Sequence, residues 1–317
     1  MSERRSKLVV IALGGNAIIS SGQRGTIAEQ FENSRKSLNG VVKCIQNGFD
    51  VVITHGNGPQ VGDALIRAEM ASNVVPVNPL GICVAETEGT MGYMLQQTLM
   101  NTLKSANQDN PVVALVTQVL VDPSDDAFDN PTKPIGPSYD EWEAIKFRNE
   151  RDWKLIENSH GEYRRVVASP IPLEIIDADV IKHLVDIGMV VIAAGGGGIP
   201  VRKNEDGKLE GVDAVIDKDF ASAILAREVG ASTLLMATAV DGVYLNFNTP
   251  GQELLSDLKA EDARRYLEVG HFPPGSMGPK IEAALNFLEE GGSNVVICSV
   301  DDIASALKGK KGTSITI

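Results

Sequence analysis

Cysteine is scarce in this sequence of 317 residues, which contains three. Cys44, Cys83 and Cys298 are far apart, and each stands among apolar residues. A disulfide framework needs a denser set of cysteines, and a structural zinc site needs them at short spacings, so both are excluded as the basis of the fold. Scarce cysteine is typical of the reducing cytosol, and we expect a cytoplasmic protein.

Positive charge is also in short supply, with 29 lysines and arginines against 42 aspartates and glutamates and a net charge of -13. A broad basic face for nucleic acid or for an anionic membrane surface is therefore excluded. No apolar run approaches the ~20 residues of a membrane span, so we expect no membrane segment. Any anionic ligand must be met by local donors.

Short apolar runs are present instead, and they alternate with helical patterns. Thr26 can cap a helix that ends near Gly48, where a left-handed residue suits a helix C-terminus. The expected strands are 8–13, 50–54, 112–117, 189–193, 233–238 and 294–299, and further helices are expected at 177–187, 217–229 and 279–290. This alternation predicts an α/β fold with a mainly parallel sheet that is covered on both faces.

Two segments interrupt the alternation. Residues 121–165 are polar and rich in proline, but Trp142, Trp153 and Tyr139 favour an ordered insert that acts as a lid. Residues 200–213 are expected to form a surface hairpin between an N-terminal lobe, 1–200, and a C-terminal lobe, 201–317.

The common phosphate-binding motifs are missing: there is no G-x-x-x-x-G-K-[ST], and "GNGPQVG" lacks the context of a dinucleotide site. Glycines do, however, follow three predicted strands, in "GGN" (14–16), "THGNGPQVG" (54–62) and "AAGGGGIP" (193–200). Each could be a plain turn, but parallel strands place all three at one sheet edge, where backbone N–H groups can cradle an anion. This predicts a phosphate or carboxylate site. We interpret His55 as a packed residue outside the chemistry.

Two lysines stand at predicted helix starts. Lys218 and Asp219 open one helix in "IDKDFASAILA", and Lys280 follows Pro279 in "PGSMGPKIEAAL". Alone, each could be a solvated first-turn residue. Beside anion cradles, they match the mobile positive charge and positioning carboxylate that phosphoryl transfer needs. The stretch "TAVDGVYLNF" is either a simple turn or one wall of an adenine pocket.

Taken together, "IALGGNA", "THGNGPQVG", "NPTKPIGP", "AAGGGGIPV", "VIDKDFASAILA", "TAVDGVYLNF" and "GSMGPKIEAA" resemble the carbamate kinases of the amino acid kinase family along essentially the whole chain. The resemblance implies a three-layer α/β/α sandwich with a protruding insert, the phosphoryl acceptor in the N-terminal lobe and ATP in the C-terminal lobe. It implies catalytic residues Lys133, Lys218, Asp219 and Lys280. It implies an acceptor and phosphate site made of Gly14, Gly15, Asn16, Gly56, Asn57, Gly58, Gln60, Gly195 and Gly196. It implies a nucleotide site made of Thr238, Val240, Asp241, Tyr244, Gly275, Met277, Gly278 and Pro279.

One departure from other amino acid kinases is informative. Members that act on acetylglutamate or aspartate usually carry a lysine where this chain has Ala12, and carbamate kinases instead use an insert lysine, here Lys133. The reaction implied is ATP plus carbamate giving ADP plus carbamoyl phosphate, with Mg²⁺ on the nucleotide, no residue assigned as a metal ligand, and a homodimer. We expect it to serve ATP synthesis in arginine catabolism. Carbamoyl phosphate synthesis, another acceptor such as acetylglutamate or uridylate, and a non-catalytic nucleotide sensor remain alternatives.

Overall fold

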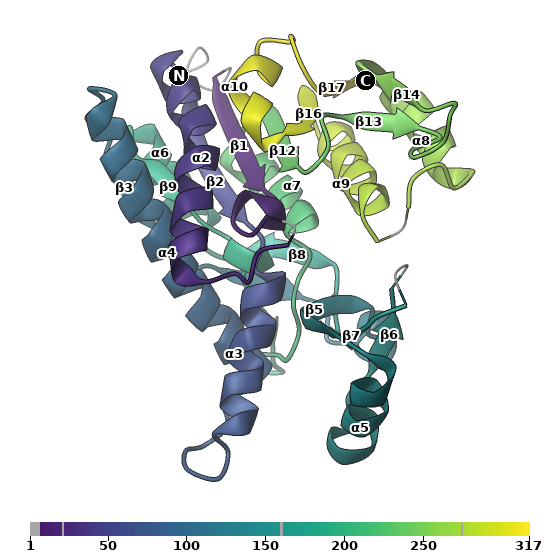
Figure 1. Ribbon diagram of the computed structural model, residues 1–317. Coiled ribbons are helices and arrows are strands. Elements are labelled where there is room, and N and C mark those ends of the chain that lie inside the picture. Colours follow the sequence, from purple (N-terminus) through teal and green to yellow (C-terminus); the bar gives the residue numbers. More distant parts are fainter. Residues whose placement is uncertain (1–6, 21, 159–160, 274) are drawn as a thin grey trace.

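The computed structural model describes residues 7–20, 22–158, 161–273 and 275–317, without the side chain of Asn16. A large sheet of eight strands runs through the molecule in the order β15-β17-β16-β12-β1-β2-β9-β3 (Figure 1). Neighbouring strands are parallel from β16 to β3, and β17 is antiparallel to β16. The strands are β1 Leu8–Leu13, β2 Asp50–His55, β3 Val112–Ala114, β9 Val190–Ile192, β12 Thr233–Thr238, β15 Asp257–Lys259, β16 Asn294–Ser299 and β17 Thr313–Thr316.

Alternate residues of β1 face opposite layers of helices. Val9 and Ile11 lie in a core with α2, α4 and α10, whereas Val10 and Ala12 lie in a core with α6, α7, α8 and α9. The helices are α2 Ile27–Gln46, α3 Gly58–Met70, α4 Leu80–Ser105, α6 Ala178–Asp186, α7 Lys218–Val229, α8 Ala260–Glu268, α9 Met277–Glu289 and α10 Ile303–Ala306. The prediction of a parallel sheet between two helical layers is therefore confirmed. No helix in the described ranges is both long and apolar enough to cross a membrane.

Most predicted elements form close to their expected bounds. Thr26 caps α2, its hydroxyl accepting the N–H of Glu29, and Gly48 has φ +80° just beyond the helix end. The strand expected at 112–117 stops at Ala114, and the helix expected at 279–290 begins at Met277. The sequence analysis did not predict α3 or α4. The apolar pattern of α4 is weak because Ile82, Tyr93 and Met100 stand on its exposed face and Thr87 and Glu88 on its buried one.

The insert forms a small body of its own that projects from the sheet (Figure 1, teal). It consists of β5 Lys133–Tyr139, α5 Glu141–Arg151, β6 Leu155–Glu157 and β7 Tyr163–Val167, with the strand order β5-β7-β6. The rings of Tyr139, Phe147 and Trp153 pack together, with centroids 4.7 to 5.9 Å apart. This aromatic core is the reason that a polar, proline-rich segment is ordered.

The insert contacts the rest of the chain through α3. A Cβ atom at Gly62 of α3 would lie 2.1 Å from the backbone of Gly136 in β5, so the two backbones touch. Glu69, further along α3, accepts a hydrogen bond from Arg165 at 2.8 Å and pairs with Arg151 at 3.4 Å. We expect this contact to fix the position of β5, and therefore of Lys133.

The remaining strands form two smaller sheets. One has the order β11-β10-β4-β8 and the other pairs β13 with β14. Their bounds are β4 Gln118–Val121, β8 Pro172–Ile175, β10 Ile199–Lys203, β11 Leu209–Gly211, β13 Val243–Leu245 and β14 Glu253–Leu255. β10 and β11 are antiparallel, which confirms the hairpin predicted at 200–213.

Candidate active site

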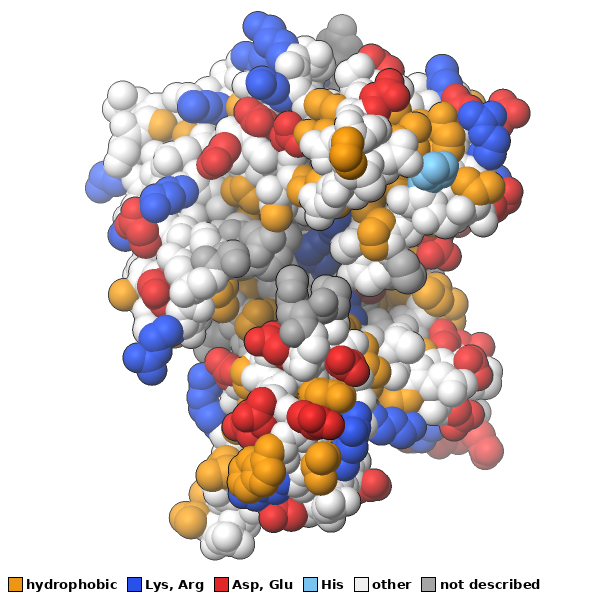
Figure 2. Space-filling model, turned by 45° about the vertical axis from the view of Figure 1, so that its right-hand side comes forward, with side chains coloured by type: hydrophobic (Ala, Val, Ile, Leu, Met, Phe, Trp, Pro, Cys, Tyr) orange, Lys and Arg blue, Asp and Glu red, His pale blue; other side chains and the backbone are white. Residues whose placement is uncertain are grey.

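A cleft of about 480 Å³ opens where β12, β1 and β2 end, between the main body and the insert. Figure 2 shows this face hollowed, with lysine or arginine side chains at the bottom of the hollow. The predicted residues among its lining are Gly14, Gly15, Gly56, Asn57, Gly58, Lys133, Gly196, Lys218, Asp219, Thr238, Val240, Tyr244, Gly275, Met277, Pro279 and Lys280. The carboxyl ends of adjacent parallel strands thus bring together segments that are far apart in sequence.

The glycines at the strand ends allow close packing. A Cβ atom at Gly14 would lie 2.8 Å from the carbonyl oxygen of Ala237, and one at Gly56 would lie 3.4 Å from Cδ of Lys218. The N–H of Gly14 donates to Ala237, and the N–H of Gly56 donates to Leu13. These two N–H groups extend the sheet, so these two glycines contribute space for the lysine and the ligand rather than donors.

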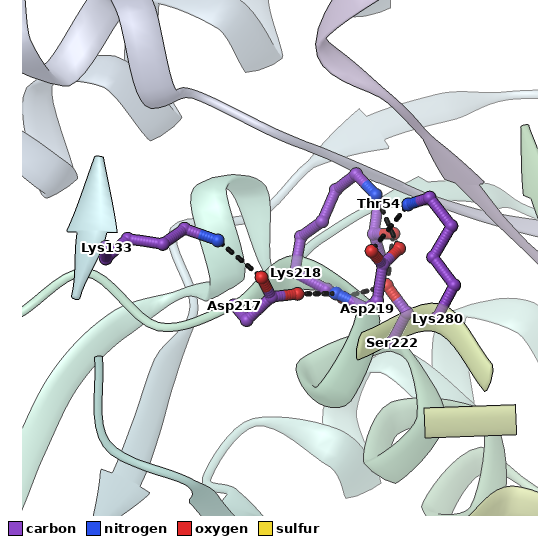
Figure 3. Close-up of polar contacts among 7 residues, drawn as sticks. All are labelled: Thr54, Lys133, Asp217, Lys218, Asp219, Ser222 and Lys280. Atoms are coloured by element: carbon purple, nitrogen blue, oxygen red, sulfur yellow. Dashed lines mark hydrogen bonds and ion pairs between the residues drawn. The ribbon is translucent and has the colours of Figure 1, made fainter. Parts of the chain in front are cut away.

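A triad of buried Asp219 and the partly buried Lys218 and Lys280 lies in this cleft (Figure 3). The Asp219 carboxylate accepts from Nζ of Lys218 at 2.5 Å through one oxygen and from Nζ of Lys280 at 2.6 Å through the other. Burial alone would raise the pKa of Asp219, but the two ammonium groups outweigh burial and hold that pKa well below its usual range. With all three groups ionised, the triad carries one net positive charge, which suits a phosphate ligand.

The start of α7 is fixed from two sides. Asp217 caps the helix, its carboxylate accepting the N–H of Asp219 at 2.8 Å. Ser222 Oγ lies 2.6 Å from Thr54 Oγ1 at the end of β2 and 2.5 Å from the carbonyl of Lys218. Through Ser222, these contacts hold Lys218 close to the end of β2, which Gly56 follows.

Lys133 reaches into the cleft from β5 and forms an ion pair with Asp217 (Figure 3). Sequence reasoning did not select Asp217, although an aspartate directly before a predicted helix is a usual cap. Arg164 of β7 also lines the cleft and was not selected. It donates to the carbonyl of Gly136 at 2.8 Å. Two cations of the insert, Lys133 and Arg164, therefore line the same cleft as the lysine triad.

The other end of the cleft is more apolar. Thr238 ends β12 and Val240 lies just beyond it, and Met277 and Pro279 belong to the first turn of α9. The rings of Tyr244 and Phe247 have centroids 5.7 Å apart, and both line the cleft. Other lining residues that sequence reasoning did not select are Ala239, Gly242, His271, Phe272, Pro273 and Ser276. An apolar pocket next to the charged triad suits the base and the phosphates of a nucleotide.

Four predicted residues lie outside the lining. Gln60 donates to Gln30 of α2, and Asp241 accepts from the hydroxyl of Tyr244 at 2.7 Å. Gly278 is buried and donates to the carbonyl of Pro273. Gly195 donates to the carboxyl of Glu88. The side chain of Asn16 lies outside the described part of the structure.

His55 is fully buried, and burial lowers its pKa to about 4, so its ring is neutral near pH 7. Its Nδ1 lies 3.2 Å from the carbonyl of Gly56. His55 does not line the cleft. This environment agrees with the interpretation of His55 as a packed residue.

Comparison with known proteins places this geometry in a family. The model of the amino acid kinase family matches residues 7–299. A carbamate kinase of Thermococcus kodakarensis is 46% identical over 312 residues, covering 98% of this chain and 99% of that protein. A carbamate kinase-like protein of Escherichia coli is 45% identical over 312 residues and 98% of both chains. The structure of a carbamate kinase from Giardia lamblia bound to AMP-PNP superposes with a TM-score of 0.90 at 40% identity, covering 99% of each chain. The chain is a kinase and belongs to the amino acid kinase family, where it groups with the carbamate kinases.

Proposed function

We propose that this protein catalyses reversible phosphoryl transfer between ATP and carbamate, and that it works in the direction of ATP. The observation that carries the proposal is the meeting of Lys218, Asp219 and Lys280 in one cleft with Lys133 of the insert. The two lysines of the triad would neutralise the phosphates at the ends of β1 and β2. Lys133 would meet the carbamoyl end from the opposite side.

In the ATP-forming direction, an oxygen of the ADP β-phosphate attacks the phosphorus of carbamoyl phosphate. The bond between phosphorus and the carbamate oxygen breaks, and carbamate leaves as an anion without a proton transfer. No general base is needed, which agrees with a neutral, buried His55. Alignment and charge neutralisation by this chain's lysines supply the catalysis.

Mg²⁺ would neutralise further charge on the nucleotide phosphates when it is bound. No group of three or more His, Cys, Asp or Glu side chains that could hold a metal ion occurs in the described ranges. Asp217 and Asp219 line the cleft, and Mg²⁺ in kinases needs only one or two carboxylates because phosphates and water complete its shell. The cleft therefore fits a metal that arrives with the nucleotide.

We further propose that the acceptor binds to the lobe of residues 1–200 and the nucleotide to the lobe of 201–317, in a cytoplasmic homodimer. The polar residues Lys133 and Asn57 lie at one end of the cleft and Tyr244 and Met277 at the other. For the dimer, Ile82, Tyr93 and Met100 are about half exposed on α4. Their spacings of 11 and 7 residues place them on one face of the helix.

The proposed reaction is tested with a panel of acceptors under identical Mg²⁺ and nucleotide concentrations. We expect ATP from ADP and carbamoyl phosphate, and negligible transfer from ATP to acetylglutamate, aspartate or uridylate. A larger acceptor would leave charged groups unpaired in this cleft. The enzyme should therefore discriminate against it by a factor on the order of 10⁴. Comparable kcat/KM for a larger acceptor would overturn the carbamate assignment. Binding of nucleotide without transfer would favour the sensor alternative.

Direction and pathway are tested in cells. If the enzyme serves ATP synthesis in arginine catabolism, deleting its gene should lower ATP yield during growth on arginine. Dependence on the gene for products made from carbamoyl phosphate would instead favour a role in carbamoyl phosphate synthesis.

A further inference from the structure

Glu88 is a buried acid that the proposed reaction does not use. It lies in the middle of α4 and is 3% exposed. One carboxyl oxygen accepts the N–H of Gly195 at 3.0 Å, and the other accepts the N–H of Thr117 at 3.0 Å. Burial of a carboxyl group is costly, so a buried acid that holds two backbone N–H groups calls for a reason.

Glu88 holds a turn whose backbone is unusual. Ala194 has φ +49° and ψ +40°, and the following residues Gly196, Gly197 and Gly198 all have positive φ. A left-handed alanine costs roughly 1 kcal/mol and persists only where its surroundings impose it. Thr117 supplies a second restraint, because its hydroxyl accepts the N–H of Ala194 at 3.0 Å.

The turn lies between the two halves of the cleft. A Cβ atom at Gly196 would lie 2.1 Å from Nδ2 of Asn57, and one at Gly197 would lie 2.4 Å from the carbonyl of Ile216. Asn57 belongs to the acceptor side, and Ile216 directly precedes Asp217 and the lysine triad. The turn therefore sets the spacing between the acceptor residues and the start of α7.

α4 restrains the acceptor side directly as well. Thr87, the neighbour of Glu88, accepts a hydrogen bond from Nδ2 of Asn57 at 2.9 Å. Two successive residues of α4 thus hold Asn57 and the turn that packs against it.

We propose that Glu88 is a positioning residue for phosphoryl transfer, which acts through the turn of residues 194–198 to align Asn57 with Lys218 of α7. This inference rests on the proposed function. Glu88 does not line the cleft, so its effect on transfer must pass through the turn. A displacement of about 1 Å in such an arrangement can lower turnover about 10²-fold.

The decisive variant is Glu88→Gln. The amide nitrogen of glutamine donates hydrogen bonds and does not accept them. In this variant the N–H of Thr117 or of Gly195 would therefore face another donor. We expect kcat for ATP formation to fall about 10- to 100-fold, or KM for carbamoyl phosphate to rise by as much. ADP affinity, measured by calorimetry, should change by less than about two-fold because the close contacts of the turn are with Asn57 and Ile216.

Asp177→Asn is the matched control. Asp177 accepts the N–H of Gln118, the residue after Thr117, at 2.8 Å, but does not line the cleft. It should leave kcat and both substrate constants unchanged. Thr117→Val tests the same turn if Glu88→Gln does not fold. It should likewise lower kcat while ADP affinity stays nearly unchanged.

The outcomes separate the two proposals. A wild-type protein that forms no ATP from carbamoyl phosphate overturns the proposed function itself. An active wild type whose Glu88→Gln and Thr117→Val variants keep normal kinetics overturns the positioning role. Equal losses of ADP and carbamoyl phosphate binding, or a lower unfolding temperature with unchanged turnover per folded molecule, also overturn it.

Discussion

Nζ of Lys280 lies 2.6 Å from Oδ2 of Asp219, although 61 residues separate the two in the chain. Lys280 belongs to the first turn of α9 and Asp219 to that of α7. Both helices pack on the same face of the sheet, with their first turns at the cleft. Burial lowers the pKa of Lys218 although Asp219 opposes it, whereas the pKa of Lys280 is raised because Asp219 outweighs burial. The shared carboxylate also fixes where both ammonium groups point.

Removing either triad lysine should lower turnover strongly. For Lys218→Ala and Lys280→Ala, we expect kcat to fall by roughly 10² to 10³ because each loses one preorganised charge at the transferred phosphoryl group. ATP formation from carbamoyl phosphate measures the effect, with circular dichroism as the test of folding. Lys208→Ala, an exposed lysine of the β10–β11 turn, is the control and should behave like the wild type. Normal turnover in both triad variants would remove these lysines from the mechanism.

Lys133 should affect the acceptor and not the nucleotide. It enters the cleft from the insert and pairs with Asp217. We expect Lys133→Ala to impair turnover or carbamoyl phosphate binding while ADP affinity stays nearly unchanged. Lys146→Ala, which removes an insert lysine that lies over the Trp142 ring, should have little effect. Parallel losses for both ligands would instead indicate damage to the fold.

The contact between α3 and the insert gives a test at a glycine. Gly62→Ala places a Cβ against the backbone of Gly136, so β5 must move and Lys133 with it. We expect carbamoyl phosphate turnover to fall on the order of 10²-fold. Gly89→Ala is a matched helical control, since nothing lies within 4 Å of its Cβ position, and it should stabilise α4 by about 0.5–1 kcal/mol. If Gly62→Ala shows wild-type kinetics, the insert does not depend on this contact.

Glu88 should make stability depend on pH in a particular direction. Burial raises its pKa to about 8, against the opposing effect of the N–H groups of Thr117 and Gly195. The folded state then binds a proton between about pH 4.5 and 8 that the unfolded state releases. The contribution of Glu88 to stability is therefore present below about pH 4.5 and is lost as pH rises to 8.

Urea unfolding of the wild type and of Glu88→Gln at pH 5.5 and pH 8.5 measures this difference. The stability of the wild type relative to the variant should be lower at pH 8.5. His55 also changes stability with pH, since its pKa is about 4 when folded and about 6.5 when unfolded, but both proteins contain it and its contribution cancels in the difference. An equal difference at both pH values would contradict a raised pKa for Glu88.

Local patterns in the sequence predicted the parallel sheet and its flanking helices, although not α3 or α4, and part of the cleft; the resemblance to carbamate kinases implied the other site residues. Strand-length apolar runs predicted the parallel sheet, and glycines at strand ends together with Lys218 and Lys280 at helix starts predicted an anion site. Such signals are readable because they depend on residues adjacent in the chain: a β-strand needs an apolar run, and a helix start needs a cap.

The contacts between distant segments were decided only by the tertiary structure. The pairing of Lys133 with Asp217 joins residues 84 apart, and the hold of Glu88 on Gly195 joins residues 107 apart. The periodicity of α4 does not single out Glu88, because polar residues lie on its buried face and apolar residues on its exposed face. The sequence by itself determined which elements form and which chemistry their ends carry. The order of the strands in the sheet determined which of those ends meet, since parallel strands with long connections can be arranged in many ways.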